Sequence, residues 1–159
     1  MGVICVIVCL AIGHLIHTFS IMRFKLYTDG GARGNPGPAA IGIYLCHLDG
    51  EVVLEHGETI GVATNNVAEY RALIEGLKRA RDLDAKSLEC FLDSELVVKQ
   101  LQGEYQIKNF QLQKLFDEVR RAEVSFEYVS YTHLPRENEN MRRADQLVNY
   151  ALDYEQGRA

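Results

Sequence analysis

The sequence predicts an α/β fold in which a five-stranded mixed sheet is flanked by helices. The chain has 159 residues, of which 47% are hydrophobic and 25% are charged, as in a single globular domain. Short apolar or alternating runs bounded by turn residues recur along it, which is typical of strands. Longer stretches with apolar residues at helical spacing lie between them, so the expected order is three strands, a helix, a strand, two helices, a strand and a helix.

The first three strands are expected to form an antiparallel meander. Residues 23–29 alternate between apolar and polar side chains, and residues 30–38 hold four glycines and two prolines, which indicates a loop. Residues 39–48 are apolar enough for a buried strand. Asp49-Gly50 is a strong hairpin signal, and residues 51–60 then form the returning strand.

The second half of the domain alternates helices with strands. Thr64 or Asn65 is the expected N-cap of a helix that extends to Asp82, because both residue types can accept a hydrogen bond from the first turn. The remaining elements are expected at residues 88–92 (strand), 94–102 (helix, ended by Gly103), 110–122 (helix), 124–132 (strand) and 142–154 (helix).

Residues 1–22 are an apolar extension without Asp, Glu, Lys or Arg. A run of that length could span a bilayer, since about 20 apolar residues suffice. Arg23 and Lys25 follow at once, and basic residues beside a span favour the cytoplasmic side. The extension is therefore either a membrane anchor on a cytoplasmic domain or an over-long start, with Met22 as the working first residue. We favour the second interpretation, because the domain pattern begins at Arg23 without a linker.

The charge balance excludes one common class of nucleic-acid-binding protein. The formal net charge is −5, whereas a protein that holds nucleic acid by bulk electrostatics is usually basic. The same charge is compatible with a nuclease whose acidic site attracts phosphate only when cations are bound. The four cysteines form no CxxC pair, and no Cys/His cluster has the spacing of a zinc site.

Four carboxylates stand where an element meets a loop or packs inward. Asp29 falls on the first strand, Glu69 in the first turns of the long helix, Asp93 at the end of the fourth strand, and Asp145 at the opening of the last helix. Each one alone is more often a helix cap or a solvated charge. Gathered together they would repel one another, and burial would be costly unless hard cations such as Mg²⁺ or Mn²⁺ neutralised them.

The chain resembles type 1 ribonuclease H, and specifically the short bacterial and archaeal-type members. The resemblance rests on four blocks in family order, from Arg23 to the C-terminus: YTDGGARGNPGPA at residues 27–39, TNNVAEYRAL at 64–73, LDSELV at 92–97, and HLPRE at 133–137 followed by ADQLVN at 144–149. It implies a ribonuclease H-like fold with strands 1–3 antiparallel, and a catalytic domain over residues 23–156.

The resemblance also implies a role for each site residue. Asp29, Glu69, Asp93 and Asp145 match the family's metal-binding carboxylates, which would hold two Mg²⁺ ions, with Mn²⁺ as an alternative. Residues that match contacts to nucleic acid are Gly30, Gly31, Asn35, Asn65 and Asn66. An amide can both donate to and accept from the 2′-hydroxyl that distinguishes RNA from DNA, and glycine allows close backbone approach.

His133 matches, in approximate alignment, a histidine that assists proton transfer or product release in some members, although a lone histidine is more often structural or exposed. Three departures bear on these assignments. The segment from Arg136 to Asp145 is about two residues longer than in related chains, so either Asn138 or Asn140 fills the family's asparagine position. Glu95 replaces a glutamine that contacts the hybrid in some members. The chain lacks a basic, tryptophan-bearing handle before the 110–122 helix, which predicts weaker hybrid binding with a steep salt dependence.

The expected function is endonucleolytic hydrolysis of the RNA strand of RNA–DNA hybrids by two metal ions, giving 5′-phosphate and 3′-hydroxyl ends. We expect a monomeric cytoplasmic enzyme without a small-molecule cofactor, and a membrane association only if residues 1–22 are an anchor. The alternatives are another nuclease of the same fold, because folds host many functions, or a non-catalytic hybrid-binding module.

Overall fold

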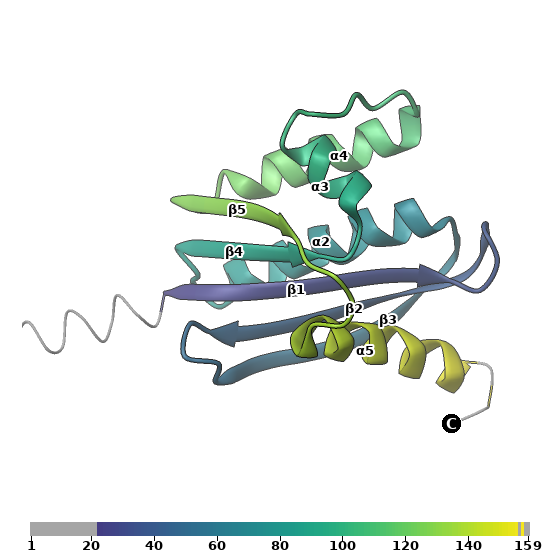
Figure 1. Cartoon of the computed structure of the whole chain (residues 1–159), viewed down its shortest axis with the longest axis horizontal. Coiled ribbons are helices and arrows are strands. Elements are labelled where there is room, and N and C mark those ends of the chain that lie inside the picture. Colours follow the sequence, from purple (N-terminus) through teal and green to yellow (C-terminus); the bar gives the residue numbers. More distant parts are fainter. Residues whose placement is uncertain (1–21, 156, 158–159) are drawn as a thin grey trace, which may run out of the picture.

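The computed structural model describes residues 22–155 and 157, so the apolar extension predicted at residues 1–22 lies outside the described residues except for Met22. Within the described part, no helix is long and apolar enough to cross a membrane. One sheet forms the middle layer, with a single helix on one face and the other helices on the opposite face (Figure 1).

The sheet has five strands in the order β3-β2-β1-β4-β5, which confirms the predicted mixed sheet. β1 (Arg23–Ala32) pairs antiparallel with β2 (Gly37–His47), and β2 pairs antiparallel with β3 (Val52–Ala63). β4 (Ser87–Leu92) runs parallel to β1, and β5 (Tyr128–His133) runs parallel to β4. The predicted meander of the first three strands is therefore confirmed, and β1 lies at the centre of the sheet.

The helices divide between the two faces of the sheet. α2 (Asn65–Asp82) packs on β1 and β2, and α4 (Phe110–Glu123) packs on α2. The short α3 (Glu95–Leu101) follows β4 and contacts β5. α5 (Glu139–Glu155) crosses β1, β2 and β3 on the other face (Figure 1).

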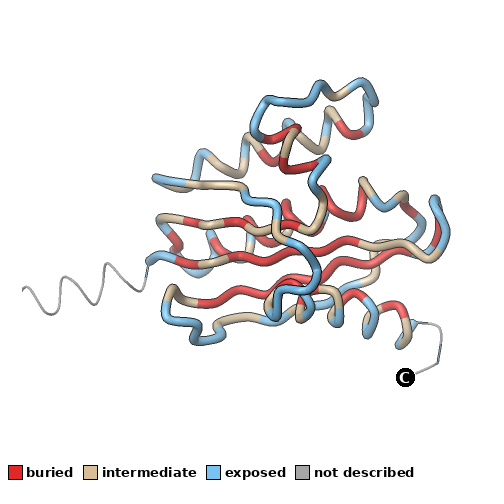
Figure 2. Tube along the Cα trace, viewed as in Figure 1, coloured by how far each residue is buried: buried red, intermediate tan, exposed pale blue. Residues whose placement is uncertain are grey.

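The alternation along β1 gives each face its own core. Leu26 and Thr28 are fully buried and lie against Gly76 of α2. Tyr27 packs with Tyr44 and Met141 on the α5 side. Figure 2 shows that the central strands are the most continuously buried part of the chain. Because side chains alternate along a strand, Asp29 shares the α5 face with Tyr27, where helix and sheet meet at the carboxyl end of β1.

Two glycines let α5 lie very close to the sheet. A Cβ atom on Gly42 would lie 2.1 Å from the carbonyl oxygen of Ala144, and one on Gly57 would lie 2.5 Å from that of Leu147. Any side chain at either position would therefore lift α5 off the sheet. Since Gly42 pairs with Asp29 in the β1–β2 register, this close contact also fixes how near Asp145 of α5 comes to Asp29.

The boundaries of the last two elements differ from the prediction. β5 begins at Tyr128 rather than at residue 124, because Val124 caps α4 and the chain then turns, with Phe126 N donating to Glu123 O. α5 begins at Glu139 rather than at residue 142, because Asn138 Oδ1 accepts from Asn140 N and Met141 N. Asp145 therefore lies within α5 instead of opening it.

Candidate active site

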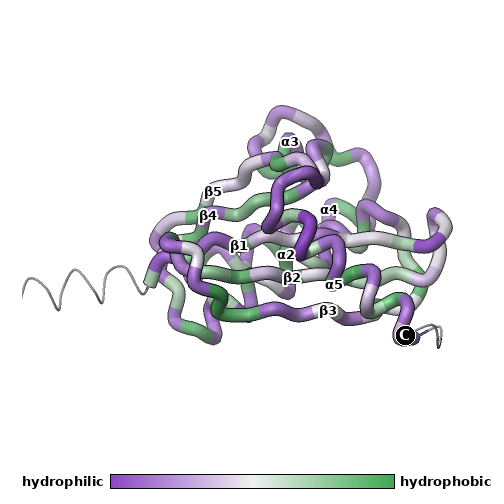
Figure 3. Tube along the Cα trace, turned by 60° about the horizontal axis from the view of Figure 1, so that its bottom comes forward, coloured by the Kyte–Doolittle hydropathy of each residue, from purple (hydrophilic) through white to green (hydrophobic). Residues whose placement is uncertain are grey.

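Three of the four predicted carboxylates surround a single guanidinium group. Arg136 Nη2 lies 2.6 Å from Asp93 Oδ2 and 3.5 Å from Asp29 Oδ1, and Arg136 Nη1 lies 3.4 Å from Asp145 Oδ1. These acids come from β1, from the turn after β4 and from α5. Arg136 itself belongs to the hydrophilic segment between β5 and α5, which is visible in Figure 3. Residues far apart in the sequence therefore meet at the carboxyl ends of the central strands β1 and β4.

Glu69 completes this acidic group from the α2 side. It lies in the second turn of α2, and its charge interacts with those of Asp29 and Asp93. A Cβ atom on Gly30 would lie 2.3 Å from the backbone nitrogen of Glu69, so β1 and α2 touch at this point. The structure thus brings Glu69, Asp93 and Asp145 within electrostatic reach of Asp29.

Asp29 and Glu69 are the two buried members of this acidic group. Asp29 is 2% exposed and Glu69 is 7% exposed, and among the described residues Asp29 Oδ1 and Glu69 Oε2 have no hydrogen-bond partner. Burial, opposed by Arg136, raises the pKa of Asp29 to about 6, with the charges of Asp145 and Asp93 adding to the rise. Burial and the charge of Asp29 raise the pKa of Glu69 well above its usual range. Acidic oxygens in this condition are suited to a bound cation.

The donor set fits hard divalent cations. All four candidate ligands are carboxylates, which Mg²⁺ and Mn²⁺ prefer over the nitrogen and sulfur ligands of softer metals. In the described part of the chain, no three acidic, histidine or cysteine side chains are grouped closely enough to hold a metal ion as they stand. The guanidinium of Arg136 lies among the carboxylates instead, and its side chain is 53% exposed.

The predicted RNA-contacting asparagines lie beside this acidic group and are joined to one another. Asn35 Oδ1 accepts from Asn65 N at 3.1 Å, and Asn65 Oδ1 accepts from Ala32 N at 2.9 Å. Thr64 is the N-cap of α2 through its hydroxyl group, which settles the predicted choice between Thr64 and Asn65. The loop after β1 is thereby fixed against the N-terminus of α2.

A pocket of about 320 Å³ connects the two groups. It is lined by Asp29, Gly30, Gly31, Ala32, Arg33, Asn65, Glu69, Arg136, Asp145, Val148, Asn149 and Leu152. Both predicted glycines, one of the three asparagines and three of the four carboxylates therefore face the same cavity.

His133 lies apart from this cavity. It is the last residue of β5, pairs with Leu92 in the sheet and is exposed. Within residues 22–155 and 157, no hydrogen bond or ion pair joins it to the four carboxylates. Its part in proton transfer stays a prediction.

Two neighbours of the carboxylates carry no assigned role in the sequence prediction. Arg136 stands in the HLPRE block, shortly before the segment that holds Asp145. A basic residue so close to a predicted metal-binding carboxylate is the signal that could have pointed to it. Asn149 lies four residues after Asp145, and its Nδ2 donates to Asp145 Oδ2 at 3.2 Å and to Asp145 O at 3.0 Å. Spacing of four on a helix predicts such a contact, although not its value to the site.

Replacing Asp29 with asparagine should stabilise the protein when divalent cations are removed. With a pKa of about 6 in the folded state and about 3.9 in the unfolded state, Asp29 binds its proton more tightly when folded. The resulting stabilisation is complete below the unfolded pKa and is lost as the pH rises through the folded one. We expect Asp29→Asn to raise the free energy of unfolding by about 1–3 kcal/mol at pH 7.5, with little gain at pH 4.

Urea unfolding in EDTA at several pH values measures this difference. Asp117→Asn is the matched control, because Asp117 is exposed on α4 and should show no such trend. If the wild-type protein were as stable as the variant at pH 7.5, the charged form of Asp29 would not destabilise the fold, and the prediction would be wrong.

The chain is similar to known proteins both in sequence and in structure. A family model described as "Reverse transcriptase-like" matches residues 27–151. Ribonuclease HI of Halobacterium salinarum is 46% identical over 131 residues, which are 82% of this chain and 65% of that protein, so the chain spans less than two thirds of that relative. The crystal structure of RNase H1 from the same archaeon matches with a TM-score of 0.80 and 45% identity, covering 83% of this chain and 98% of that one. LC11-RNase H1, crystallised in complex with an RNA/DNA hybrid, matches with a TM-score of 0.78 and 40% identity, covering 84% and 99%.

Proposed function

Because this chain belongs to the ribonuclease H1 family, we propose that it hydrolyses the RNA strand of RNA–DNA hybrids through a catalytic domain over residues 23–156. The observation that carries the proposal is the meeting of Asp29, Asp93 and Asp145 around one guanidinium, with Glu69 beside them. A relative of 40% identity that was crystallised with an RNA/DNA hybrid supports the choice of substrate.

The four carboxylates would hold two divalent cations. Asp29 and Asp145 would hold one, and Asp29, Glu69 and Asp93 the other. When bound, such a pair activates a water molecule and stabilises the leaving 3′ oxygen of a phosphodiester. Asp29 Oδ1 and Glu69 Oε2 are buried without a hydrogen-bond partner in the described part of the chain, and a bound cation would compensate for their burial.

Arg136 would balance the acidic charge in the metal-free protein. Its guanidinium contacts three carboxylates, and its half-exposed side chain extends from a loop. Cation binding requires these contacts to open, so Arg136 would move aside as the cations enter. Its positive charge then remains close to the site, where the phosphates of the substrate strand arrive.

The asparagines would select RNA over DNA. The side-chain oxygens of Asn35 and Asn65 accept backbone hydrogen bonds within the protein, which orients their amide groups beside the acidic site. Their NH₂ groups can donate to a ribose 2′-hydroxyl, as can the side chain of the neighbouring Asn66. A strand that lacks this hydroxyl would leave those donors without partners, which disfavours DNA in the same position.

A cleavage assay on three labelled duplexes, RNA–DNA, RNA–RNA and DNA–DNA, tests the proposal. We expect the chain to cut the RNA strand of an RNA–DNA hybrid in Mg²⁺ or Mn²⁺, to leave 5′-phosphate and 3′-hydroxyl ends, and to spare DNA–DNA. Activity should fall to background in EDTA and return with added metal. Cleavage of DNA would favour another nuclease of the same fold, and hybrid binding without cleavage would favour a non-catalytic module.

A further inference from the structure

The loop after β1 is joined to α5 as well as to α2. On the α2 side, Asn35 and Asn65 connect it through the two hydrogen bonds described above. On the α5 side, Arg33 Nη2 lies 2.6 Å from Asp153 Oδ1, across 120 residues of sequence. The loop therefore connects α2, which carries Asn65 and Asn66, to α5, which carries Asp145.

Asp153 shares one face of α5 with Asp145, the predicted metal-binding carboxylate of this helix. Asp145, Asn149 and Asp153 are spaced by four residues, so they lie in a row along the helix. Asp145 and Asn149 line the 320 Å³ pocket together with Arg33. The ion pair thus joins Arg33, which lines the pocket, to Asp153, which lies on the same side of α5 as Asp145 and Asn149.

We propose that the Arg33–Asp153 ion pair is a clamp that sets the distance between the loop and α5, and that both residues act as positioning residues for hydrolysis. The proposal rests on the proposed function. Its basis is geometric, because one bound strand must place a ribose against Asn35 and Asn65 and a phosphate against Asp145. If α5 moves relative to the loop, a strand held by the asparagines presents its phosphate less accurately.

The expected kinetic effect is on turnover more than on binding. Both side chains are about one-third exposed, so the pair contributes little to folding stability. A misplacement of the reacting groups of about 1 Å can nevertheless lower a rate by as much as about 100-fold. We therefore expect Arg33→Ala and Asp153→Ala each to lower kcat roughly tenfold, with little change in KM for the hybrid.

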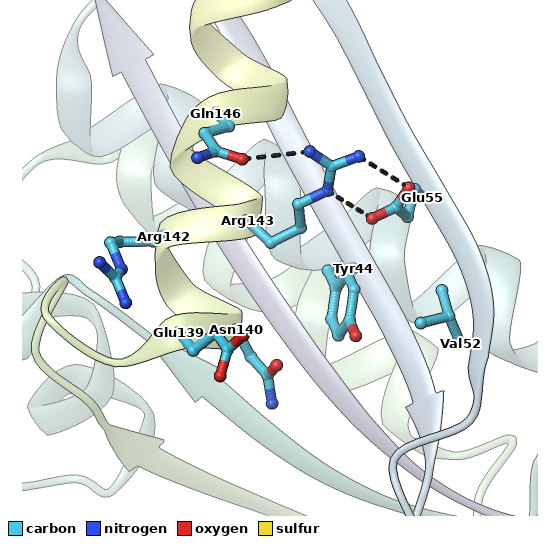
Figure 4. Close-up of a pocket in the computed structure, with 8 residues that line it drawn as sticks. All are labelled: Tyr44, Val52, Glu55, Glu139, Asn140, Arg142, Arg143 and Gln146. Carbon is cyan, nitrogen blue, oxygen red and sulfur yellow. Dashed lines mark hydrogen bonds and ion pairs between the residues drawn. The ribbon is translucent and has the colours of Figure 1, made fainter.

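A second ion pair on the same helix provides a matched control. Arg143 Nε and Nη2 lie 2.5 and 3.0 Å from the two carboxylate oxygens of Glu55 in β3, on the side of α5 away from the acidic group. Figure 4 shows Arg143 between Glu55 and Gln146, above the ring of Tyr44. Arg143→Ala and Glu55→Ala each remove an ion pair between α5 and the sheet whose side chains are about as exposed as those of Arg33 and Asp153, without touching the loop after β1.

The experiment compares steady-state cleavage of an RNA–DNA hybrid by the full chain and its variants in Mg²⁺. The set is Arg33→Ala, Asp153→Ala, their double mutant, the charge-reversed Arg33→Asp/Asp153→Arg pair, and the two control variants. We expect the double mutant to be no slower than the slower single mutant, because both changes remove the same ion pair. The charge-reversed pair should regain most of the lost kcat, and the controls should stay within about twofold of wild type.

Three results would overturn the clamp. Unchanged kcat in Arg33→Ala and Asp153→Ala would show that the pair does not position the site. Impairment by Arg33→Ala but not by Asp153→Ala would show that Arg33 acts through something other than its ion pair with Asp153. Equal impairment by the control variants would show that any loosening of α5 has the same effect. A wild-type chain that fails to cut the hybrid would instead refute the proposed function itself.

Discussion

Replacing Asp93 with asparagine should lower the rate of hybrid cleavage by at least about 10³-fold while the fold stays intact. Asp93 Oδ2 accepts from Arg136 at 2.6 Å, and its carboxylate is a candidate ligand of one of the two cations. Asparagine keeps the shape but removes the charge that attracts a divalent ion. The lost ion pair with a half-exposed arginine should cost only about 0–1 kcal/mol of folding stability.

The measurement is single-turnover cleavage of a labelled hybrid in Mg²⁺, with circular dichroism to confirm the fold. Asp82→Asn is a suitable control, because Asp82 is exposed at the opposite end of α2 from the acidic group and should leave the rate unchanged. Cleavage by Asp93→Asn at the wild-type rate would remove Asp93 from the metal-binding set.

The sheet was largely predictable, because its signals are local. β1 alternates, Asp49-Gly50 marks the hairpin, and α2 keeps helical spacing after its cap at Thr64. The boundaries of β5 and α5 were missed for a physical reason. Val124 continues an apolar pattern, which favours a strand, but it is 84% exposed at the end of α4. The first turn of α5 is mostly polar and lacks apolar residues at helical spacing, so the cap at Asn138 was not recognised.

The assembly of the site is a different matter, because no local rule brings distant residues together. Asp29, Glu69 and Asp145 lie on three separate elements, and only the family resemblance indicated that they converge. The position of Arg136 among the carboxylates and the contact between Arg33 and Asp153 depend on how the β5–α5 loop and α5 sit on the sheet. Such contacts follow from packing, which spacing along the chain does not encode.

Replacing Gly30 with alanine should disrupt both stability and activity, because β1 touches α2 at this residue. A Cβ atom there would lie 2.2 Å from the carbonyl carbon of Ala68 and 2.3 Å from the nitrogen of Glu69. Both are backbone atoms, so relief requires α2 to shift as a whole. We expect the free energy of unfolding to fall by about 2–3 kcal/mol or more. The shift also separates Glu69 from Asp29, so hybrid cleavage should fall even where the variant remains folded.

Gly31→Ala is a close control for this prediction, since the two glycines are adjacent and both line the pocket. A Cβ atom on Gly31 would meet only a methyl group, Val148 Cγ1, at 3.2 Å, and that side chain can give by a few tenths of an ångström. Its unfolding free energy should therefore change by less than about 1 kcal/mol. Urea unfolding of both variants separates the two cases, and the cleavage rate of Gly30→Ala in Mg²⁺ then reports the displacement of Glu69. If Gly30→Ala proved as stable as Gly31→Ala, the close contact between α2 and β1 would be contradicted. The placement of Glu69 near Asp29, which depends on that contact, would be contradicted with it.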